Sequence, residues 1–161
     1  MHDVDPLDAR ILLALDADPQ STVVALAERL GVSRNTVHAR LGRLERDGAL
    51  GPVSRRLDPA ALGRPLMAFV TVSVSQREGE RAGVDLARIP EVIEVLETTG
   101  DADLLARVVA RDTADLHRIT RLVHGVSGVV RTGTVIVLAE VAPLGLDRLL
   151  RERAGDPTRT G

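Results

Sequence analysis

The chain has 161 residues, a formal net charge of −2 and an apolar fraction of 44%. These values allow one domain or two small ones and give no overall sign of a polyanionic partner. The absence of cysteine excludes disulfides and thiolate chemistry, and with Phe69 as the one aromatic residue, stacking on single-stranded nucleic acid is disfavoured. No apolar run reaches transmembrane length, and the opening MHDVDPLDAR lacks a signal-peptide pattern, so we expect a soluble cytoplasmic protein without a membrane partner.

Three helices are predicted in the first third of the chain. The first runs from about residue 6 to 16. A second apolar pattern stops at Gly31, and a third begins after Ser33, which is a favourable N-cap. Gly31 supplies the positive φ angle that a tight interhelical turn needs. This arrangement is typical of a helix-turn-helix, whose second helix enters the major groove of DNA.

The third helix has two kinds of face. Val37, Leu41 and Leu44 share one stripe and are predicted to pack inward. The candidate DNA-binding residues on the other faces are Ser33, Arg34, Asn35, Thr36, His38, Arg40, Arg43 and Arg46. Four of them are expected to face the major groove: Arg34, Asn35, His38 and Arg43. An ordinary amphipathic helix with solvated charges would show the same pattern, but the glycine turn before it favours DNA binding.

Local charge supports the same interpretation. Residues 33–56 contain six arginines and two acidic residues, a net charge of +4, which suits contact with phosphates. The stretch LGPVSRRL at residues 50–57 predicts a short strand or wing, whose Arg55 and Arg56 are expected to bind phosphate. Residues 1–60 are therefore predicted to form a winged helix-turn-helix.

The second half of the chain alternates strand and helix patterns. Strands are predicted at residues 66–74, 92–98, 103–110 and 129–141, with helices at about 80–88 and 113–124. This βαββαβ order is the ferredoxin-like pattern, with both helices on one face of an antiparallel sheet. The prediction is thus an α+β protein with a ferredoxin-like domain at residues 61–150. The tail at 151–161 lacks apolar periodicity and is expected to be disordered.

Both faces of the predicted sheet are largely apolar. Alternate strand residues such as Val70 and Val72 are apolar, and so are Met67 and Phe69 between them. Because the two helices cover only one face, the other face needs a partner. We therefore expect an obligate homodimer through this domain, and a pseudo-palindromic DNA site to match its two-fold symmetry.

Four segments together resemble the Lrp/AsnC family of bacterial and archaeal regulators. They are LDARILLAL, LAERLGVSRNTVHARLGRLERDGALG, TTGDADLL and GVVRTGTVIVLAEV, and the resemblance spans about Leu7 to Leu150. It implies a nucleoid-associated regulator of transcription that binds double-stranded DNA as dimers and assembles further, for example into octamers. It also implies that the second domain binds a small effector, commonly an amino acid.

The resemblance places the effector around the turn at residues 100–103. By spacing alone this turn is an ordinary hairpin, for which glycine and aspartate are common choices. In the family the effector pocket is built around it, which implies that Gly100 and the carboxylate of Asp101 or Asp103 hold the charged ends of an amino acid. Thr132 and Thr134 would add hydroxyls from a neighbouring subunit, or are simply exposed strand residues.

No cofactor, metal site or catalytic group is predicted. His117 and His124 lie seven residues apart on one helix, but zinc needs three or four ligands. Two other functions remain open. Sirohaem decarboxylases share this architecture and would need histidine ligands and a large apolar cavity, and a DNA-architectural protein would bind no effector.

Overall fold

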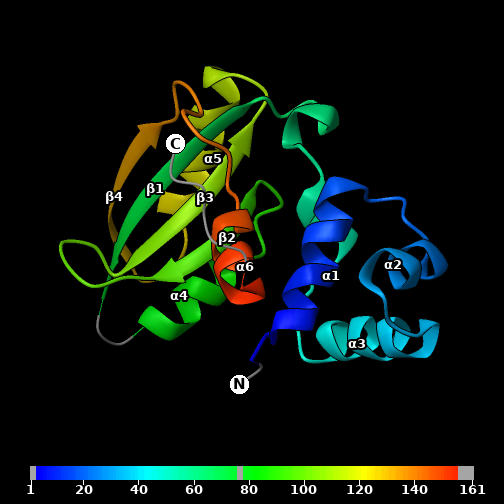
Figure 1. Cartoon of the computed structure of the whole chain (residues 1–161). Helices are drawn as coiled ribbons and strands as arrows, with labels where there is room; N and C mark the ends of the chain where they lie inside the picture. The colour runs from blue at the N-terminus through cyan, green and yellow to red at the C-terminus, as the bar shows by residue number, and fades with distance from the viewer. Residues whose placement is uncertain (1–2, 76–77, 156–161) are drawn as a thin grey trace. The chain divides into compact units, whose positions relative to one another are not determined.

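The chain forms two compact units (Figure 1), and the structure, a computed structural model, describes residues 3–75 and 78–155. Unit 1 comprises Met1–Arg55 together with Ala142–Gly161, and unit 2 comprises Arg56–Val141. The sequence prediction assigned residues up to 150 to the second domain. The segment after the last strand instead groups with the helical unit.

The first helix of unit 1, α1 (Pro6–Ala17), begins with a reciprocal cap. The Asp5 carboxylate accepts hydrogen bonds from the N–H groups of Leu7 at 2.9 Å and Asp8 at 3.0 Å. The Asp8 carboxylate accepts one from the N–H of Asp5 at 3.1 Å. Pro6 occupies a first-turn position, where its missing N–H costs no helical hydrogen bond. The predicted first helix is confirmed.

The helix-turn-helix consists of α2 (Val23–Leu30) and α3 (Arg34–Arg46). Gly31 between them has a φ angle of 68°, and the Ser33 hydroxyl caps α3 by accepting from the N–H of Thr36 at 3.1 Å. Both features were predicted from the sequence. The helices enclose a small apolar cluster, whose buried members are Ala14, Leu26, Ala27 and Val37.

Unit 1 also contains α6 (Asp147–Ala154), which packs against α1. The expectation of disorder from residue 151 onward is wrong for Arg151–Ala154; residues 156–161 lie outside the described part of the chain. Arg153 explains much of the ordering, because its Nε donates to the carbonyl of Val4 at 2.5 Å and its guanidinium pairs with Asp3. Such a tertiary contact leaves no periodicity in the sequence.

Of the short strand or wing predicted at residues 50–57, the strand is not present in the described residues. Two short 3₁₀ helices, η1 (Val53–Arg56) and η2 (Pro59–Leu62), follow α3 instead. Pro52 has no N–H to donate to a ladder, and a strand is stable only beside a paired neighbour. The wing segment of this chain is therefore a 3₁₀ turn.

Unit 2 has the predicted βαββαβ order. Its sheet is antiparallel, with strand order β2-β3-β1-β4. The strands are β1 (Leu66–Val74), β2 (Val92–Glu97), β3 (Leu104–Ala110) and β4 (Val129–Ile136). The helices are α4 (Gly79–Leu86) and α5 (Thr113–His124).

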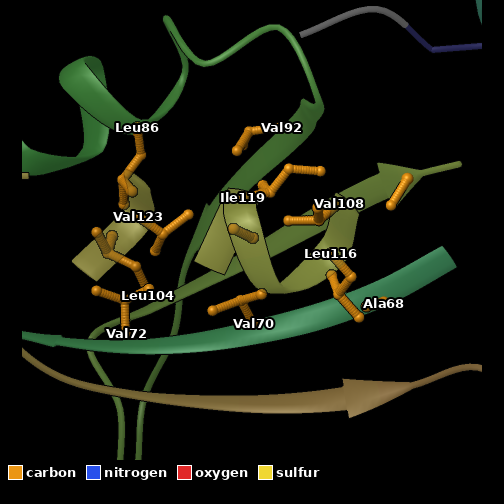
Figure 2. Close-up of a cluster of buried hydrophobic side chains, with 12 residues drawn as sticks. Ala68, Val70, Val72, Leu86, Val92, Leu104, Val108, Leu116, Ile119 and Val123 are labelled. Carbon is orange, nitrogen blue, oxygen red and sulfur yellow. The ribbon is translucent and has the colours of Figure 1, made fainter. Parts of the chain in front are cut away.

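The core of unit 2 lies between one face of the sheet and the two helices. Figure 2 shows Val70 and Val72 of β1 directed toward Ile119 and Val123 of α5, with Leu86 of α4 at one side; all five side chains are fully buried. Burying each such side chain contributes about 1.5–3 kcal/mol. Both helices therefore cover the same face, as predicted, and neither α4 nor α5 covers the other face of the sheet.

The last strand ends at Ile136, five residues before the predicted end at residue 141. The N–H of Val137 still donates to the carbonyl of Met67 at 2.9 Å. β1 begins at Leu66, so the chain beyond Val137 has no neighbour to pair with. Leu138 and Val141 are almost completely exposed as a result.

Candidate DNA-binding surface and effector cavity

The start of α3 presents a polar surface. Arg34, Asn35 and His38 are exposed, and so is Ser33, whose hydroxyl lies 2.8 Å from that of the half-buried Thr36. The first N–H groups of a helix have no intrahelical partner, and the dipole places partial positive charge there. This end of α3 is therefore suited to phosphates and to acceptor groups on base edges.

Arg40 and Arg43, which the sequence predicted as DNA contacts, turn toward α1. The Arg40 guanidinium pairs with Asp5 and lies 3.2 Å from Oδ1 of Asp8. The Arg43 guanidinium pairs with Asp8 and lies 3.8 Å from Asp5. The N–H of Asp8 and the Arg40 guanidinium together hold the pKa of the Asp5 carboxyl below its ordinary value, against the opposing effect of burial. Much of the charge on the second half of α3 is thus neutralised within unit 1.

Arg46, at the end of α3, remains exposed and lies along the backbone of Gly42. A Cβ atom on Gly42 would be only 3.2 Å from the Arg46 Nη1 atom, tighter than ordinary contacts. Gly42 is costly inside a helix, by about 1 kcal/mol relative to alanine. A side chain at position 42 would therefore require the exposed Arg46 guanidinium to shift by a few tenths of an ångström.

The wing arginines are only partly defined. Arg56 is exposed at the end of η1, and the side chain of Arg55 lies outside the described part of the structure. Their contact with phosphate stays a prediction.

In unit 2, the hairpin between β2 and β3 contains the predicted effector turn. Thr98 closes it, because its N–H donates to the carbonyl of Asp103 at 2.9 Å and its hydroxyl donates to that of Ala102 at 2.8 Å. The Asp103 carboxylate accepts from the N–H of Val74 at 2.8 Å. This carboxylate is therefore used to hold the hairpin against β1.

Beside the hairpin lies a cavity of about 310 Å³. Its lining residues are Thr71, Ser73, Asp101, Ala102, Arg131, Thr132 and Gly133. Arg131 donates from Nη2 to the carbonyl of Asp101 at 3.1 Å, and Ser73 donates to the same carbonyl at 3.5 Å. The lining residues thus include an arginine, an aspartate and hydroxyl-bearing residues, the residue types that recognise a small zwitterion. Neither histidine nor a large apolar side chain lines it, so it lacks what a tetrapyrrole requires.

The five predicted effector residues are only partly brought together. Asp101 and Thr132 line the cavity; Gly100 and Asp103 lie in the adjoining hairpin outside it. Thr132 pairs with Val72 and Thr134 with Val70 across β1 and β4. Directly paired residues share a face, so the side chains of both threonines belong to the helix-covered side, opposite to Thr71, Ser73 and Arg131. Thr132 still contributes to the lining, and Thr134 does not. A contribution of either to a neighbouring subunit stays a prediction.

Five lining residues were not predicted from the sequence: Ala102, Gly133 and the three with polar side chains, Thr71, Ser73 and Arg131. The signal was present in β1, where Thr71 and Ser73 alternate with the buried Val70 and Val72. Period-two alternation showed that they share a face. It did not show that β4 brings Arg131 beside them, because that depends on the pairing register.

Two findings bear on other functions. In residues 3–75 and 78–155, no group of three or more histidine, cysteine or carboxylate side chains is placed to hold a metal ion. Within the same ranges, none of the helices has the length and apolar character needed to cross a bilayer.

The fold and these sites define a winged helix-turn-helix DNA-binding protein with a ligand-binding domain. The winged helix-turn-helix DNA-binding family matches residues 4–50, and the Lrp/AsnC ligand binding domain matches residues 67–145. The chain belongs to the Lrp/AsnC family of transcriptional regulators.

Curated relatives agree with this assignment. The regulator AldR of Mycolicibacterium smegmatis is 34% identical over 140 residues, which cover 84% of this chain and 82% of AldR. The regulator FL11 of Pyrococcus horikoshii is 30% identical over 135 residues, which cover 84% of this chain and 89% of FL11. The function of this protein is therefore DNA-binding regulation of transcription.

Solved structures show the same architecture. The AsnC protein of E. coli has a TM-score of 0.79 at 26% identity, with 91% of this chain and 99% of that chain covered. The regulator NMB0573 of Neisseria meningitidis, solved in complex with L-methionine, has a TM-score of 0.76 at 26% identity and the same coverage.

Proposed function

We propose that this regulator recognises a specific duplex sequence through the exposed start of α3, and that an amino acid bound in the cavity of unit 2 modulates its DNA binding or its assembly. The observation that carries the proposal is the cavity itself, in which Arg131 and Asp101 supply opposite charges beside hydroxyl groups. The L-methionine complexes of two related regulators support the class of ligand.

On the DNA side, Asn35, Arg34 and His38 are assigned to base edges in the major groove. Amide and guanidinium groups form bidentate hydrogen bonds with adenine and guanine, respectively. The assigned phosphate contacts are Ser33, Thr36, Arg46, Arg55 and Arg56, since hydroxyls, arginines and helix N-termini commonly bind phosphate oxygens. Each base contact of this kind is worth about 1–3 kcal/mol of discrimination.

On the ligand side, Arg131 is the carboxylate anchor and Asp101 receives the ammonium group. Arg131 is exposed and presents a planar guanidinium, which suits bidentate recognition of a carboxylate. The Asp103 carboxylate is already engaged by the N–H of Val74, so its role is to hold the hairpin in place. Of the two aspartates, Asp101 is the one available to a ligand.

The second copy of the chain is assigned to the helix-free face of the sheet. Phe69 lies there with the guanidinium of Arg107 5.5 Å from its ring centre, and Arg107 pairs with Glu94 at 3.2 Å. Val135, paired with Phe69, is 61% exposed. This face carries apolar side chains and charges of both signs, Arg107 and Arg131 with Glu94, so it can pair with a second copy of itself about a two-fold axis. A dimer of this kind matches a pseudo-palindromic operator, and octamers would form by further association.

Calorimetric titration of the purified protein with the individual amino acids tests the ligand assignment. At least one amino acid is expected to bind, and Arg131→Gln should weaken it about tenfold or more, because a charge-assisted hydrogen bond contributes about 1.5–3 kcal/mol. Arg121→Gln, on the exposed side of α5, is the matched control and should bind normally. Undiminished binding by the Arg131 variant would place the ligand elsewhere, and a co-purifying chromophore would favour a tetrapyrrole enzyme.

A further inference from the structure

The side chain of Asp8 is fully buried in the first turn of α1, although aspartate is rarely buried. Its two oxygens are both occupied. Oδ1 receives Arg40, and Oδ2 receives both Arg43 and the N–H of Asp5. Asp5 beside it caps α1 and also pairs with Arg40. Two carboxylates of α1 and two guanidinium groups of α3 therefore form one closed group with no net charge.

The ionic group uses Arg40, in the middle of α3, and Arg43 one turn later, whereas the glycine turn lies before the start of the helix. Gly31 and the Ser33 cap fix where α3 begins. On the inner face of α3, Val37 and Leu41 pack against the apolar cluster of α1 and α2. Apolar contacts are non-directional and tolerate small rotations of a helix about its axis. Charge-assisted hydrogen bonds to two guanidinium groups restrict that rotation, because their geometry is specific.

We propose that Asp8 is a positioning residue for DNA recognition: it holds Arg40 and Arg43 against α1 and thereby sets the rotation at which α3 presents its exposed face. The two arginines do not bind phosphate in this role. Their side chains are only 29% and 39% exposed, and each is occupied by a carboxylate. The cations of α3 left for phosphate or bases are Arg34 and Arg46, which are exposed.

The salt dependence of DNA binding separates a positioning arginine from a contacting one. The probe is a duplex selected by the wild-type protein from a random library, with its scrambled version as non-specific DNA. Each lost phosphate contact lowers the slope of log K against log salt concentration by about one unit. Arg40→Gln should leave the slope unchanged, whereas Arg46→Gln should lower it. A fall of about one unit for Arg40→Gln, equal to that of the Arg46 control, would overturn the proposal.

Substitution of Asp8 tests the positioning itself. Asp8→Asn keeps the size of the side chain and removes its charge, so we expect the preference for the selected over the scrambled duplex to fall about tenfold, as for the loss of one good base contact. Binding to scrambled DNA should stay the same or strengthen, because the removal of one carboxylate leaves the group of Asp5, Arg40 and Arg43 with one net positive charge. The control, Asp16→Asn at the exposed far end of α1, should keep the full preference.

A double-mutant cycle distinguishes loss of the Asp8–Arg43 contact from general destabilisation of the fold. Asp8→Asn and Arg43→Gln act on one contact, so their effects on the preference should not add. Variants are compared only at temperatures where circular dichroism shows unit 1 folded; if Asp8→Asn does not fold, Arg40→Gln with Arg43→Gln supplies the same comparison. An unchanged preference in a folded variant would overturn the proposal. The inference rests on specific DNA recognition, and failure of the wild-type protein to prefer its selected duplex would instead refute the proposed function.

Discussion

In the recognition helix α3 and in the β2–β3 hairpin, one charged residue is exposed to a ligand and another is bound within the fold. For α3 the partner within the fold is a carboxylate, and for the hairpin it is a backbone N–H group. On α3, Arg34 is exposed while Arg40 is paired with carboxylates of α1. In the hairpin, Asp101 lines the cavity while the Asp103 carboxylate accepts from the backbone of Val74. In both regions one charged residue is available to a ligand and a near neighbour is used by the fold. Charge and position along the chain therefore do not identify a contact residue; its existing partners do.

The largest effect is expected from a substitution on the sheet face of unit 2 that is proposed to bind a second copy of the chain. Val135→Asp places a charge on the proposed dimer face, and burying an unpaired carboxylate costs several kcal/mol, so the dimer dissociation constant should rise about a hundredfold or more. Sedimentation velocity at micromolar concentration measures it. Arg121→Gln, on the exposed side of α5 and away from this face, should remain dimeric, and a wild-type monomer would refute the face assignment.

Substitution of the two hairpin aspartates should have different effects: loss of ligand binding for Asp101 and loss of stability for Asp103. Asp101→Ala is expected to abolish calorimetric binding of the responsive amino acid with the melting temperature little changed. Asp103→Ala should lower the free energy of unfolding by about 1 kcal/mol, since the N–H of Val74 loses its acceptor, and should keep measurable binding. The reverse pattern would show that Asp103, not Asp101, is the ligand residue.

Replacement of Asn35 sharpens the assignment of the exposed α3 face. Asn35→Ala should relax discrimination at one base position of the operator by about 1–3 kcal/mol and leave binding to unrelated duplexes nearly constant. Competition with singly substituted duplexes measures this. A uniform loss across all duplexes would reassign Asn35 to the phosphate backbone.

The wing arginines should contribute equally to the binding of all DNA sequences. The double change Arg55→Ala and Arg56→Ala is expected to weaken all duplexes alike and to lower the salt slope by about one unit per lost contact. Anisotropy titrations over a range of salt concentrations provide the slope. If both affinity and slope were unchanged, the 3₁₀ segment would have no role in phosphate binding.

The smallest expected effect is a loss of thermal stability of unit 2 at low pH. The Arg111 guanidinium and N–H, together with Arg118, hold the pKa of the Asp115 carboxyl well below its ordinary 3.8. A depressed carboxyl pKa stabilises the fold above the ordinary value, and that contribution is lost as the pH falls below it. The melting temperature of unit 2 should therefore drop below about pH 4. The drop should be smaller in Asp115→Asn; an equal drop in both proteins would assign it to other carboxyls.

Most of the elements could be predicted from the sequence, because their signals are local. The helix period, the glycine turn at Gly31 and the Ser33 cap define the helix-turn-helix, and period-two alternation defines β1. The incorrect predictions concern segments whose structure depends on contacts with residues distant in the sequence. α6 is held partly by Arg153 through contacts with Asp3 and Val4 at the other end of the chain.

For the two sites, too, the features that depend on local sequence could be predicted and those that depend on distant residues could not. Helical periodicity identified which residues of α3 are buried, but the partners of Arg40 and Arg43 lie more than thirty residues earlier, on α1. The cavity residue Arg131 comes beside Asp101 only through the register of β4 on β1. Neither relationship has a sequence pattern, although the acidic first turn of α1 offered possible partners for the arginines.

Sequence preference is expected to depend on the exposed start of α3. The most direct test of this dependence is an anisotropy titration of the wild-type protein and of the double variant Arg34→Ala/Asn35→Ala against the selected duplex and its scrambled version. The wild-type protein is expected to prefer the selected duplex by about a thousandfold or more at physiological salt, within the range of specific DNA-binding proteins. The double variant should remain folded and lose most of that preference. Equal preference in both proteins would contradict the account and place sequence recognition outside this face of α3.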